Sequence, residues 1–192
     1  MRVLLIDDTR ARARVLREAL QDAGYEVVQA AAAPLALLKA VERAQPDVII
    51  IDVDSPSRDV LEHIVVMTQN APRPIVMFAS DGAEEKIREA VRAGVSAYVV
   101  DGIEAARVKP IIDVACARFE EFQRLRGELA QARENLSERK LVERAKGLLM
   151  QSRGLSEDDA YHALRKLAMS KKLRLGDVAQ QVIDTAELLG KG

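Results

Sequence analysis

The sequence PDVIIIDVDSPSRD, residues 46–59, decides the fold of this 192-residue chain. It places four apolar, β-branched residues in a row at 48–51, after a proline and directly before Asp52. A strand with one face in water alternates apolar and polar residues, so a continuous apolar run predicts a strand that is covered on both faces. Strands of that kind belong to parallel sheets with helices on each side.

Four further apolar runs lie before and after this one, at residues 3–6, 26–30, 75–78 and 97–100. Their spacing of about 20 to 25 residues leaves room for one crossover helix between successive strands. The joints between helix and strand carry glycine or proline, at Gly24, Pro46, Pro74 and Gly94. The pattern predicts an α/β fold, a flavodoxin-like (βα)5 sheet whose ligand site lies at the carboxyl ends of the first and third strands.

The composition limits the compartment and suggests two modules. A single cysteine, Cys116, excludes a disulfide framework, so we expect a cytoplasmic protein. Asp7 and Asp8 argue against a signal peptide, and no apolar run approaches the ~20 residues of a membrane helix. Residues 1–117 hold 14 basic and 18 acidic side chains, whereas 118–192 hold 15 and 12. An acidic first part and a basic second part indicate different partners.

The second part reads as helical, because no strand signal follows residue 103. An apolar seam repeats every three or four residues at Phe122, Leu125, Leu129, Ala132 and Leu136. This seam predicts that the fifth helix continues as a coiled coil over residues 118–136; the alternative is one long helix that packs on its own domain. Gly154 ends that helix, Ser156 with Asp159 predicts the start of a second, and a third spans about 174–189.

Three carboxylates are expected at one edge of the sheet. Asp7 and Asp8 follow the first strand, and Asp52 follows the third. Oxygen ligands of this type suit Mg²⁺, and a carboxylate beside the metal can attack a phosphoryl donor to give an aspartyl phosphate.

The same stretches resemble a known family. LLIDD (4–8), PDVIIIDVDSPSRD (46–59), PIVMFAS (74–80) and AGVSAYVVDG (93–102) are similar to the receiver domain of two-component response regulators, over about 120 residues. The resemblance implies that Asp52 is the phosphoacceptor and that Asp7, Asp8 and Asp52 hold the metal.

Two positions depart from the receiver pattern. Receivers usually have a lysine where this chain has Asp101, and a threonine or serine where it has Ala79. A carboxylate in place of that lysine reverses one unit charge beside the phosphoryl group, an effect of several kcal/mol at ~4 Å and an effective dielectric of ~20. Ser80 supplies the hydroxyl only if the register slips by one residue. Two interpretations stay open: Asp52 is phosphorylated in normal use, or the receiver serves as a docking platform.

The segment RKLVERAKGLLM, residues 139–150, predicts a helix with one buried and one basic face. Leu141, Val142, Ala145, Leu148 and Leu149 form the buried stripe. Arg139, Lys146 and Arg153 form one border of the opposite face, Lys140 and Arg144 form the other, and Gly147 lies between them. Glycine costs a helix about 1 kcal/mol relative to alanine, so a bare backbone should serve a close partner. That partner is either a neighbouring helix or a nucleic-acid backbone.

The following helix adds to the basic surface. We expect Ala160, Ala163, Leu164, Leu167 and Ala168 to face inward, and His162, Arg165, Lys166 and Met169 to face outward. A phosphate backbone would meet the first two helices of this part, because the third exposes Gln180, Asp184 and Glu187.

RKLVERAKGLLM, GLSEDDAYHALRKLAM (154–169) and LGDVAQQVI (175–183) resemble the ANTAR domain, a three-helix RNA-binding module of antitermination regulators. The resemblance implies binding to paired hairpins in leader mRNA. It implies an RNA-binding surface at Arg139, Lys140, Arg144, Lys146, Gly147, Arg165 and Met169.

We therefore predict a receiver at 1–117, a coiled-coil linker at 118–136 and an ANTAR domain at 137–190. This combination is similar to the NasT-type regulators of nitrate and nitrite assimilation. That similarity implies a sensor protein that sequesters the regulator until nitrate or nitrite binds to the sensor. Two hairpins and a coiled coil also predict a homodimer.

Two other classes of function fit less well. A DNA-binding response regulator would need a helix-turn-helix with a separate recognition helix, which the second part lacks. An enzyme would need a substrate pocket, a nucleotide-binding loop or a general base, and both histidines lie on helical segments away from the carboxylates. We expect a regulator that is not an enzyme.

Overall fold

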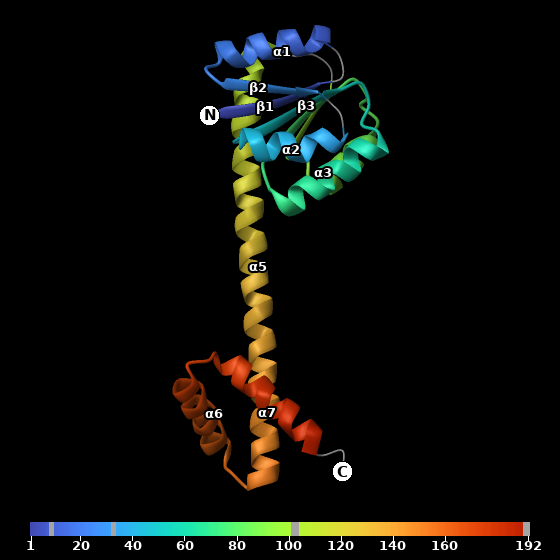
Figure 1. The fold of residues 1–192 in the computed structure, drawn as a ribbon. Coiled ribbons are helices and arrows are strands. Elements are labelled where there is room, and N and C mark those ends of the chain that lie inside the picture. The colour runs from blue at the N-terminus through green and yellow to red at the C-terminus, as the bar shows by residue number, and fades with distance from the viewer. Residues whose placement is uncertain (8–9, 32–33, 101–103, 190–192) are drawn as a thin grey trace. The chain divides into compact units, whose positions relative to one another are not determined.

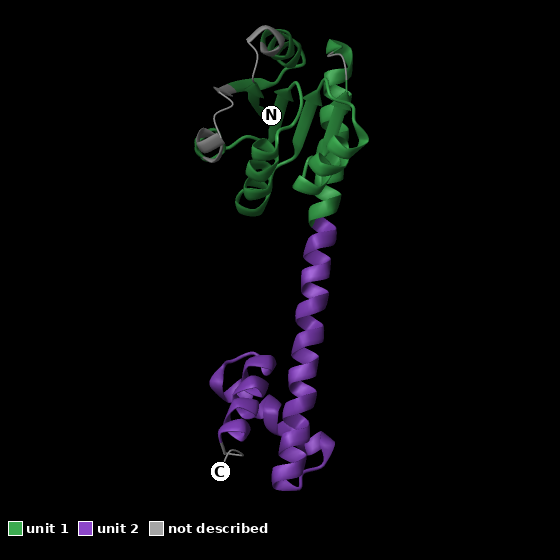
Figure 2. Cartoon of the chain, turned by 90° about the vertical axis from the view of Figure 1, so that its right-hand side faces the viewer, with its two compact units in different colours: residues 1–123 green, residues 124–192 purple. Residues whose placement is uncertain are grey.

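The computed structural model describes residues 1–7, 10–31, 34–100 and 104–189. The chain divides into two compact units, residues 1–123 and 124–192 (Figure 2). One helix, α5 (Ala105–Arg153), begins in the first unit and ends in the second. Among the described residues, no helix is both long and apolar enough to cross a membrane.

The first unit is a five-stranded parallel sheet with helices on both faces (Figure 1). The strands follow the order β2-β1-β3-β4-β5, which confirms the flavodoxin-like prediction. They are β1 (Arg2–Asp7), β2 (Glu26–Ala31), β3 (Val48–Val53), β4 (Ile75–Ala79) and β5 (Ala97–Val100). The helices of this unit are α1 (Arg10–Asp22), α2 (Pro34–Ala44), α3 (Arg58–Asn70), α4 (Glu84–Ala93) and the first part of α5.

Burial on both faces explains the unbroken apolar runs. In β3, Ile49 and Ile51 belong to one core with residues of α2, α3 and α4, while Val48 and Ile50 belong to a second core with residues of α1 and α5. Successive side chains of a strand point to opposite faces, so each face of the sheet contributes its own apolar set. Every residue of β3 is buried as a result.

The second unit is a bundle of three helices: the end of α5, α6 (Glu157–Lys171) and α7 (Leu175–Leu189). α5 ends before Gly154, whose φ of +63° is left-handed and suits glycine. Ser156 caps α6, because its Oγ accepts the backbone N–H of Asp159 at 3.1 Å and donates to the Asp159 carboxylate at 2.7 Å. These contacts confirm the predicted stop and start signals.

The core of the bundle contains the predicted stripe of α5. Val142 and Ala145 are buried against Leu164, Ala168 and residues of α7, and Leu141, Leu148 and Leu149 pack beside them. One inward assignment on α6 is wrong, because Ala163 is exposed.

Candidate functional site

The first candidate site lies where β1 and β3 end. Asp7 is paired in register with Asp52 on the neighbouring strand, and the Asp52 side chain is only 2% exposed. The sheet therefore brings these two predicted carboxylates side by side. Asp8 and Asp101 lie outside the described residues. Within the described part of the chain no three His, Cys, Asp or Glu residues form a metal site, but the two oxygen donors present are of the type that Mg²⁺ prefers.

The end of β4 offers no hydroxyl in the expected place. Ala79 is the last residue of β4, is buried, and pairs in register with Val53. Ser80 follows it and is exposed, and its backbone N–H donates to the Asp54 carbonyl at 3.0 Å. The straight alignment with the receiver pattern therefore fits the strand, with a methyl group where receivers have a hydroxyl.

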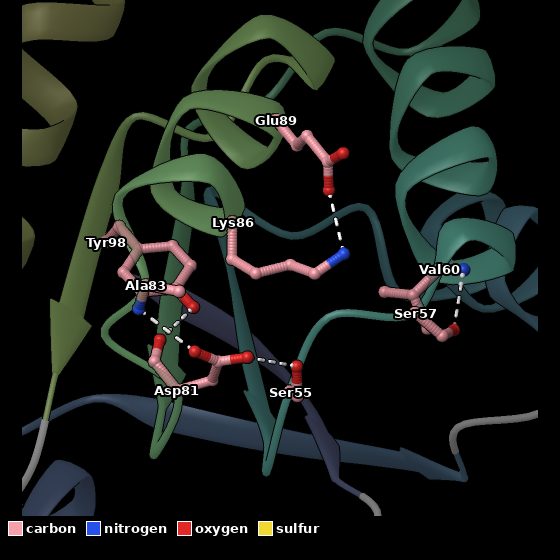
Figure 3. Close-up of polar contacts among 8 residues, drawn as sticks. All are labelled: Ser55, Ser57, Val60, Asp81, Ala83, Lys86, Glu89 and Tyr98. Atoms are coloured by element: carbon pink, nitrogen blue, oxygen red, sulfur yellow. Dashed lines mark hydrogen bonds and ion pairs between the residues drawn. The ribbon is translucent and has the colours of Figure 1, made fainter.

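The sequence analysis did not predict a group of hydrogen bonds centred on Asp81, which we call the Asp81 tie (Figure 3). Ser55 Oγ donates to Asp81 Oδ2 at 2.7 Å, and the Ala83 N–H donates to Asp81 Oδ1 at 2.9 Å. The Tyr98 hydroxyl donates to the Asp81 carbonyl at 2.6 Å. The tie joins the loop after Asp52 to the start of α4 and to β5. The aspartate that follows β4 and the tyrosine within β5 are the sequence signals for it.

The surroundings of Asp81 and Tyr98 shift the pKa values of both side chains. The Ser55 hydroxyl, followed by the Ala83 N–H, lowers the pKa of the Asp81 carboxyl, since both bonds favour the charged form. Partial burial raises the pKa of Tyr98, with a smaller contribution from Asp81. Asp81 is therefore an anion that accepts two bonds, and Tyr98 stays a neutral donor.

The second candidate site is the exposed face of α5 in the three-helix bundle. Arg139, Lys140 and Gly147 are exposed there. A Cβ built on Gly147 would meet no atom within 4 Å. The first explanation of this glycine, a neighbouring helix pressed against it, is therefore wrong within the described chain. The backbone at Gly147 is therefore exposed on the outer side of α5.

The prediction that Lys146 is exposed on the basic face of α5, together with Arg139 and Arg153, is wrong. Its side chain is buried, with the residue 7% exposed, and its Nζ lies 2.9 Å from Glu143 Oε1 and 2.7 Å from Glu157 Oε1. A buried cation requires paired carboxylates, and the long stem of lysine reaches them from the border of the helix. Lys146 thus links α5 to the first residue of α6 and offers no free charge to a ligand.

The ion pairs of Lys146 with Glu143 and Glu157, which we call the Lys146 bridge, shift the pKa values of Lys146 and Glu157 so that the charged forms are favoured. The bond to Lys146 lowers the pKa of Glu157. The bonds to Glu157 and then Glu143 raise the pKa of Lys146. The ion pair is therefore present over the whole range between acid and strongly basic solution.

The other predicted cations differ in their surroundings. Arg144 donates to Glu187 of α7 at 2.6 Å, so its charge is partly offset. Arg165 and Lys166 are exposed on α6, and Met169 is 71% exposed. The outward assignment for α6 is therefore confirmed. Of the seven cations predicted for the basic face, Lys146 is buried, Arg144 is paired with Glu187, and five are exposed and form no ion pair within the described chain: Arg139, Lys140, Arg153, Arg165 and Lys166.

The apolar seam of α5 is a third exposed feature. Phe122 is 57% exposed, Leu125 49%, Leu129 52% and Leu136 55%. The seam lies along the chain between Cys116, the last α5 residue in the core of the first unit, and Leu141, the first in the core of the second. The alternative that these side chains pack on their own domain is wrong.

Comparison with known proteins agrees with this division. Residues 3–113 match the response regulator receiver domain, and residues 130–183 match the ANTAR domain. The chain is 34% identical over 184 residues to the transcriptional regulatory protein PdtaR of Mycobacterium tuberculosis, covering 96% of this chain and 90% of that protein. It is 36% identical over 88 residues to the nitrate regulatory protein of Klebsiella oxytoca, covering 46% of this chain and 22% of that protein.

Two further similarities concern the receiver. The chemotaxis protein CheY4 of Vibrio cholerae superimposes with a TM-score of 0.52 at 28% identity, over 58% of this chain and 95% of that one. A protein-glutamate methylesterase of Xanthomonas oryzae is 37% identical over 116 residues, which is 60% of this chain but 31% of that enzyme. The full-length relative is a regulator, so the whole chain resembles regulators rather than enzymes.

We predict that Lys146→Met lowers the melting temperature of the second unit by a few degrees, because two carboxylates lose their shared counter-ion. Circular dichroism during heating measures this. The exposed Lys140→Met is the matched control and should leave the melting temperature unchanged. Equal effects of the two substitutions would contradict the structural role of Lys146.

The same bridge predicts a pH dependence. The pKa of Glu157 in the folded chain lies below its ordinary value of 4.5, so the bridge stabilises fully above that value and is lost as pH falls through the lowered pKa. The melting temperature should therefore fall more steeply for the natural chain than for Glu157→Gln as the pH is lowered from neutral to ~3.5. Parallel curves would contradict the role of Glu157.

Proposed function

Because the chain belongs to the response regulators that join a receiver domain to an ANTAR domain, we propose that it binds paired hairpins in leader mRNA and acts as a transcription antiterminator. Membership of this family makes the chain an RNA-binding response regulator. The hairpin target and the antitermination step are what we propose in addition. A protein partner controls access to the RNA in this proposal.

The observation that carries the proposal is the exposed backbone at Gly147 on a helix that also exposes Arg139 and Lys140 two turns earlier. Arg139 and Lys140 lie on the same helix, and a Cβ added at Gly147 would meet no atom within 4 Å apart from the adjoining residues and backbone of α5 itself. A phosphate backbone is the partner that gains both from cations and from close approach to a bare main chain. Arg165 and Met169 extend this surface onto α6.

Sparse aromatic content favours a particular kind of RNA recognition. Tyr161 is the single aromatic residue after Phe122 in the sequence, and it is partly exposed on α6. RNA-binding domains that stack bases on a sheet use several aromatic side chains. We therefore assign most of the affinity to contacts between Arg or Lys and phosphates, with hairpin loops read at a few positions.

Two hairpins and the exposed seam support a homodimer. Each copy would hold one hairpin, and binding of the first would raise the effective concentration of the second. The seam from Phe122 to Leu136 is the surface through which the copies would pair, because it is apolar and exposed on one helix.

We assign the receiver chiefly a docking role. Asp52 is the position of a phosphoacceptor, and Asp7 and Asp52, with Asp8, would hold Mg²⁺, which offsets phosphoryl charge when bound. Ala79 lacks the usual hydroxyl, and Asp101 replaces the usual lysine. Both departures weaken phosphorylation and favour control by a bound protein.

The nitrate or nitrite signal is the most specific part of the proposal. Its support is the partial similarity to the nitrate regulatory protein of Klebsiella oxytoca, which covers 46% of this chain. The corresponding partner would be a sensor protein that sequesters the regulator and releases it when nitrate or nitrite binds.

We predict that the natural chain binds an RNA with two hairpins more tightly than duplex DNA of the same sequence. A gel-shift assay at several salt concentrations measures this. If five cations contact phosphates on each hairpin, the logarithm of affinity should fall with the logarithm of salt with a slope of about −4 per hairpin. Tighter binding to duplex DNA would support the DNA-binding alternative and contradict the proposal.

We predict that Gly147→Ala stabilises the second unit by up to about 1 kcal/mol but weakens RNA binding by about tenfold. The added methyl favours the helix, yet it prevents close approach of the RNA. Gly127→Ala is the matched control, because Gly127 is also helical with no neighbour within 4 Å. It should stabilise α5 and leave RNA affinity unchanged. Unchanged RNA affinity in Gly147→Ala would remove the observation that carries the proposal.

We predict that Asp52→Asn leaves regulated antitermination intact in a reporter assay, because the partner acts by binding. Mass spectrometry after incubation with an acyl phosphate and Mg²⁺ should show little phosphoryl transfer to the natural chain. The double substitution Ala79→Thr/Asp101→Lys restores the usual receiver residues and should increase transfer. Complete loss of regulation in Asp52→Asn, with an unchanged melting curve, would show that phosphorylation is the control.

A further inference from the structure

The loop between β4 and α4 is joined to the loop that follows β3. The backbone N–H groups of Ser80 and Asp81 both donate to the Asp54 carbonyl, each at 3.0 Å. The Ser55 hydroxyl donates to the Asp81 carboxylate at 2.7 Å. Asp54 and Ser55 lie two and three residues after Asp52. The chain segment that carries Asp52 is therefore bonded to the start of the next loop through groups other than the Asp52 side chain.

The start of α4 depends on the same carboxylate. A helix usually begins at a residue whose side chain accepts one of the first unpaired backbone N–H groups. α4 begins after Ala83, which provides no such side chain. The Ala83 N–H itself donates to Asp81 Oδ1 at 2.9 Å, while the other carboxylate oxygen accepts the Ser55 hydroxyl. One side chain thus joins the loop after β3 to the residue that precedes α4 (Figure 3).

β5 contacts this loop at two points. The Tyr98 hydroxyl donates to the Asp81 carbonyl at 2.6 Å. A Cβ built on Gly82 would lie 3.0 Å from a methyl group of Val100, so the loop packs against the end of β5 about as closely as glycine permits. The loop before α4 is therefore fixed to β5 as well as to the loop after β3.

We propose that the Asp81 tie holds the loop before α4, the first turn of α4 and Tyr98 in one arrangement, whatever the charge at Asp52. The docking role of the receiver in the proposed function is the premise of this inference. The tie adds to that role a reason why a protein partner meets a single form of the surface around α4. A receiver controlled by phosphorylation would instead need this loop to move when the charge at Asp52 changes.

The end of β4 has no group through which a phosphoryl group at Asp52 could pull the loop. Ala79 pairs in register with Val53 and presents a methyl group, which cannot donate a hydrogen bond. The bond from the Ser80 N–H to the Asp54 carbonyl keeps this register, because it fixes the residue that directly follows the strand. The loop is therefore anchored beside Asp52 without a hydroxyl that could follow the charge.

The charge of Asp81 has the same consequence. A phosphoryl group adds negative charge at Asp52, and the Asp81 carboxylate is an anion, so the two cannot attract each other. Both oxygens of that carboxylate already accept hydrogen bonds, from Ser55 and from Ala83. A carboxylate that accepts bonds from its neighbours gains nothing by moving toward a second anion.

Hydrogen exchange of the full chain, followed by mass spectrometry, tests the tie directly. Ser55→Ala removes one donor, so the amides in the first turn of α4 should exchange on the order of 10-fold faster. Ser57→Ala is the matched control, because its hydroxyl accepts the Val60 N–H at 3.3 Å and caps α3 outside the tie. That control should speed exchange at the start of α3 only. Unchanged exchange of α4 in Ser55→Ala overturns the inference.

A second pair of variants tests whether the bonds act as one unit. Tyr98→Phe removes the hydroxyl and keeps the ring, and should also speed exchange of α4 several-fold. If the bonds support one another, Ser55→Ala/Tyr98→Phe should speed exchange by less than the product of the two single effects. Circular dichroism establishes that each variant is folded. Effects that multiply would show separate bonds and would overturn the single arrangement.

Varying the charge at Asp52 tests the independence of the tie. Asp52→Asn removes the charge and should leave exchange of α4 within about twofold of the natural chain. Asp101→Lys, treated with an acyl phosphate and Mg²⁺, adds charge to the fraction that intact-mass measurement shows to be phosphorylated. That fraction should exchange in α4 like the untreated sample. A clear change of α4 exchange in either experiment overturns the inference.

A reporter with two hairpins before a terminator separates this inference from the proposed function. Loss of the fixed surface should free the chain from its partner, so Ser55→Ala should give antitermination without the signal, whereas Ser57→Ala stays regulated. A Ser55→Ala chain that stays regulated overturns the role of the tie in docking, although RNA binding holds. A natural chain that fails to bind the hairpins overturns the RNA target, while the exchange measurements still decide whether the tie holds α4.

Discussion

The bridge between Lys146 and the carboxylates of Glu143 and Glu157 is the interaction on which the second unit depends. Lys146 and Asp52 are the two buried charged residues in the described chain, one in each unit. A charge removed from water must be matched by partners, and the partners of Lys146 come from two helices. The requirement fixes the start of α6 against α5.

The same bridge changes the charge that a ligand would meet. Glu143 is exposed on α5, one turn after the exposed cations Arg139 and Lys140, and Glu157 is exposed at the start of α6. Left alone, both would repel a phosphate backbone. With Lys146 Nζ within hydrogen-bond distance of both carboxylates, their negative charge is partly neutralised. If RNA binds to this face as proposed, Lys146 would reduce the repulsion of the phosphate backbone without contacting it.

Sequence periodicity predicted most of the fold and only part of the site. The five strands, the continuation of α5 and the caps at Gly154 and Ser156 followed from local patterns, because burial on both sheet faces and helix termination are determined by nearby residues. The position of Lys146 did not follow, since a helical wheel gives the direction of Cβ and not the end of a long side chain. The Asp81 tie was also missed, because it depends on loops that only the folded sheet brings together.

The exposed apolar seam, from Phe122 to Leu136, and the exposed cations that begin at Arg139 occupy consecutive parts of α5. The heptad positions that hold apolar residues up to Leu136 hold Arg139 and Glu143 next, so a pair of helices that is apolar and dry along the seam becomes polar at Arg139. Charged residues at core positions favour solvent over a close helix pair. The two helices should therefore separate after Leu136. Separation at that point would leave Gly147 accessible, so the residues that would end the proposed dimer interface are the ones at which the proposed RNA-binding surface begins.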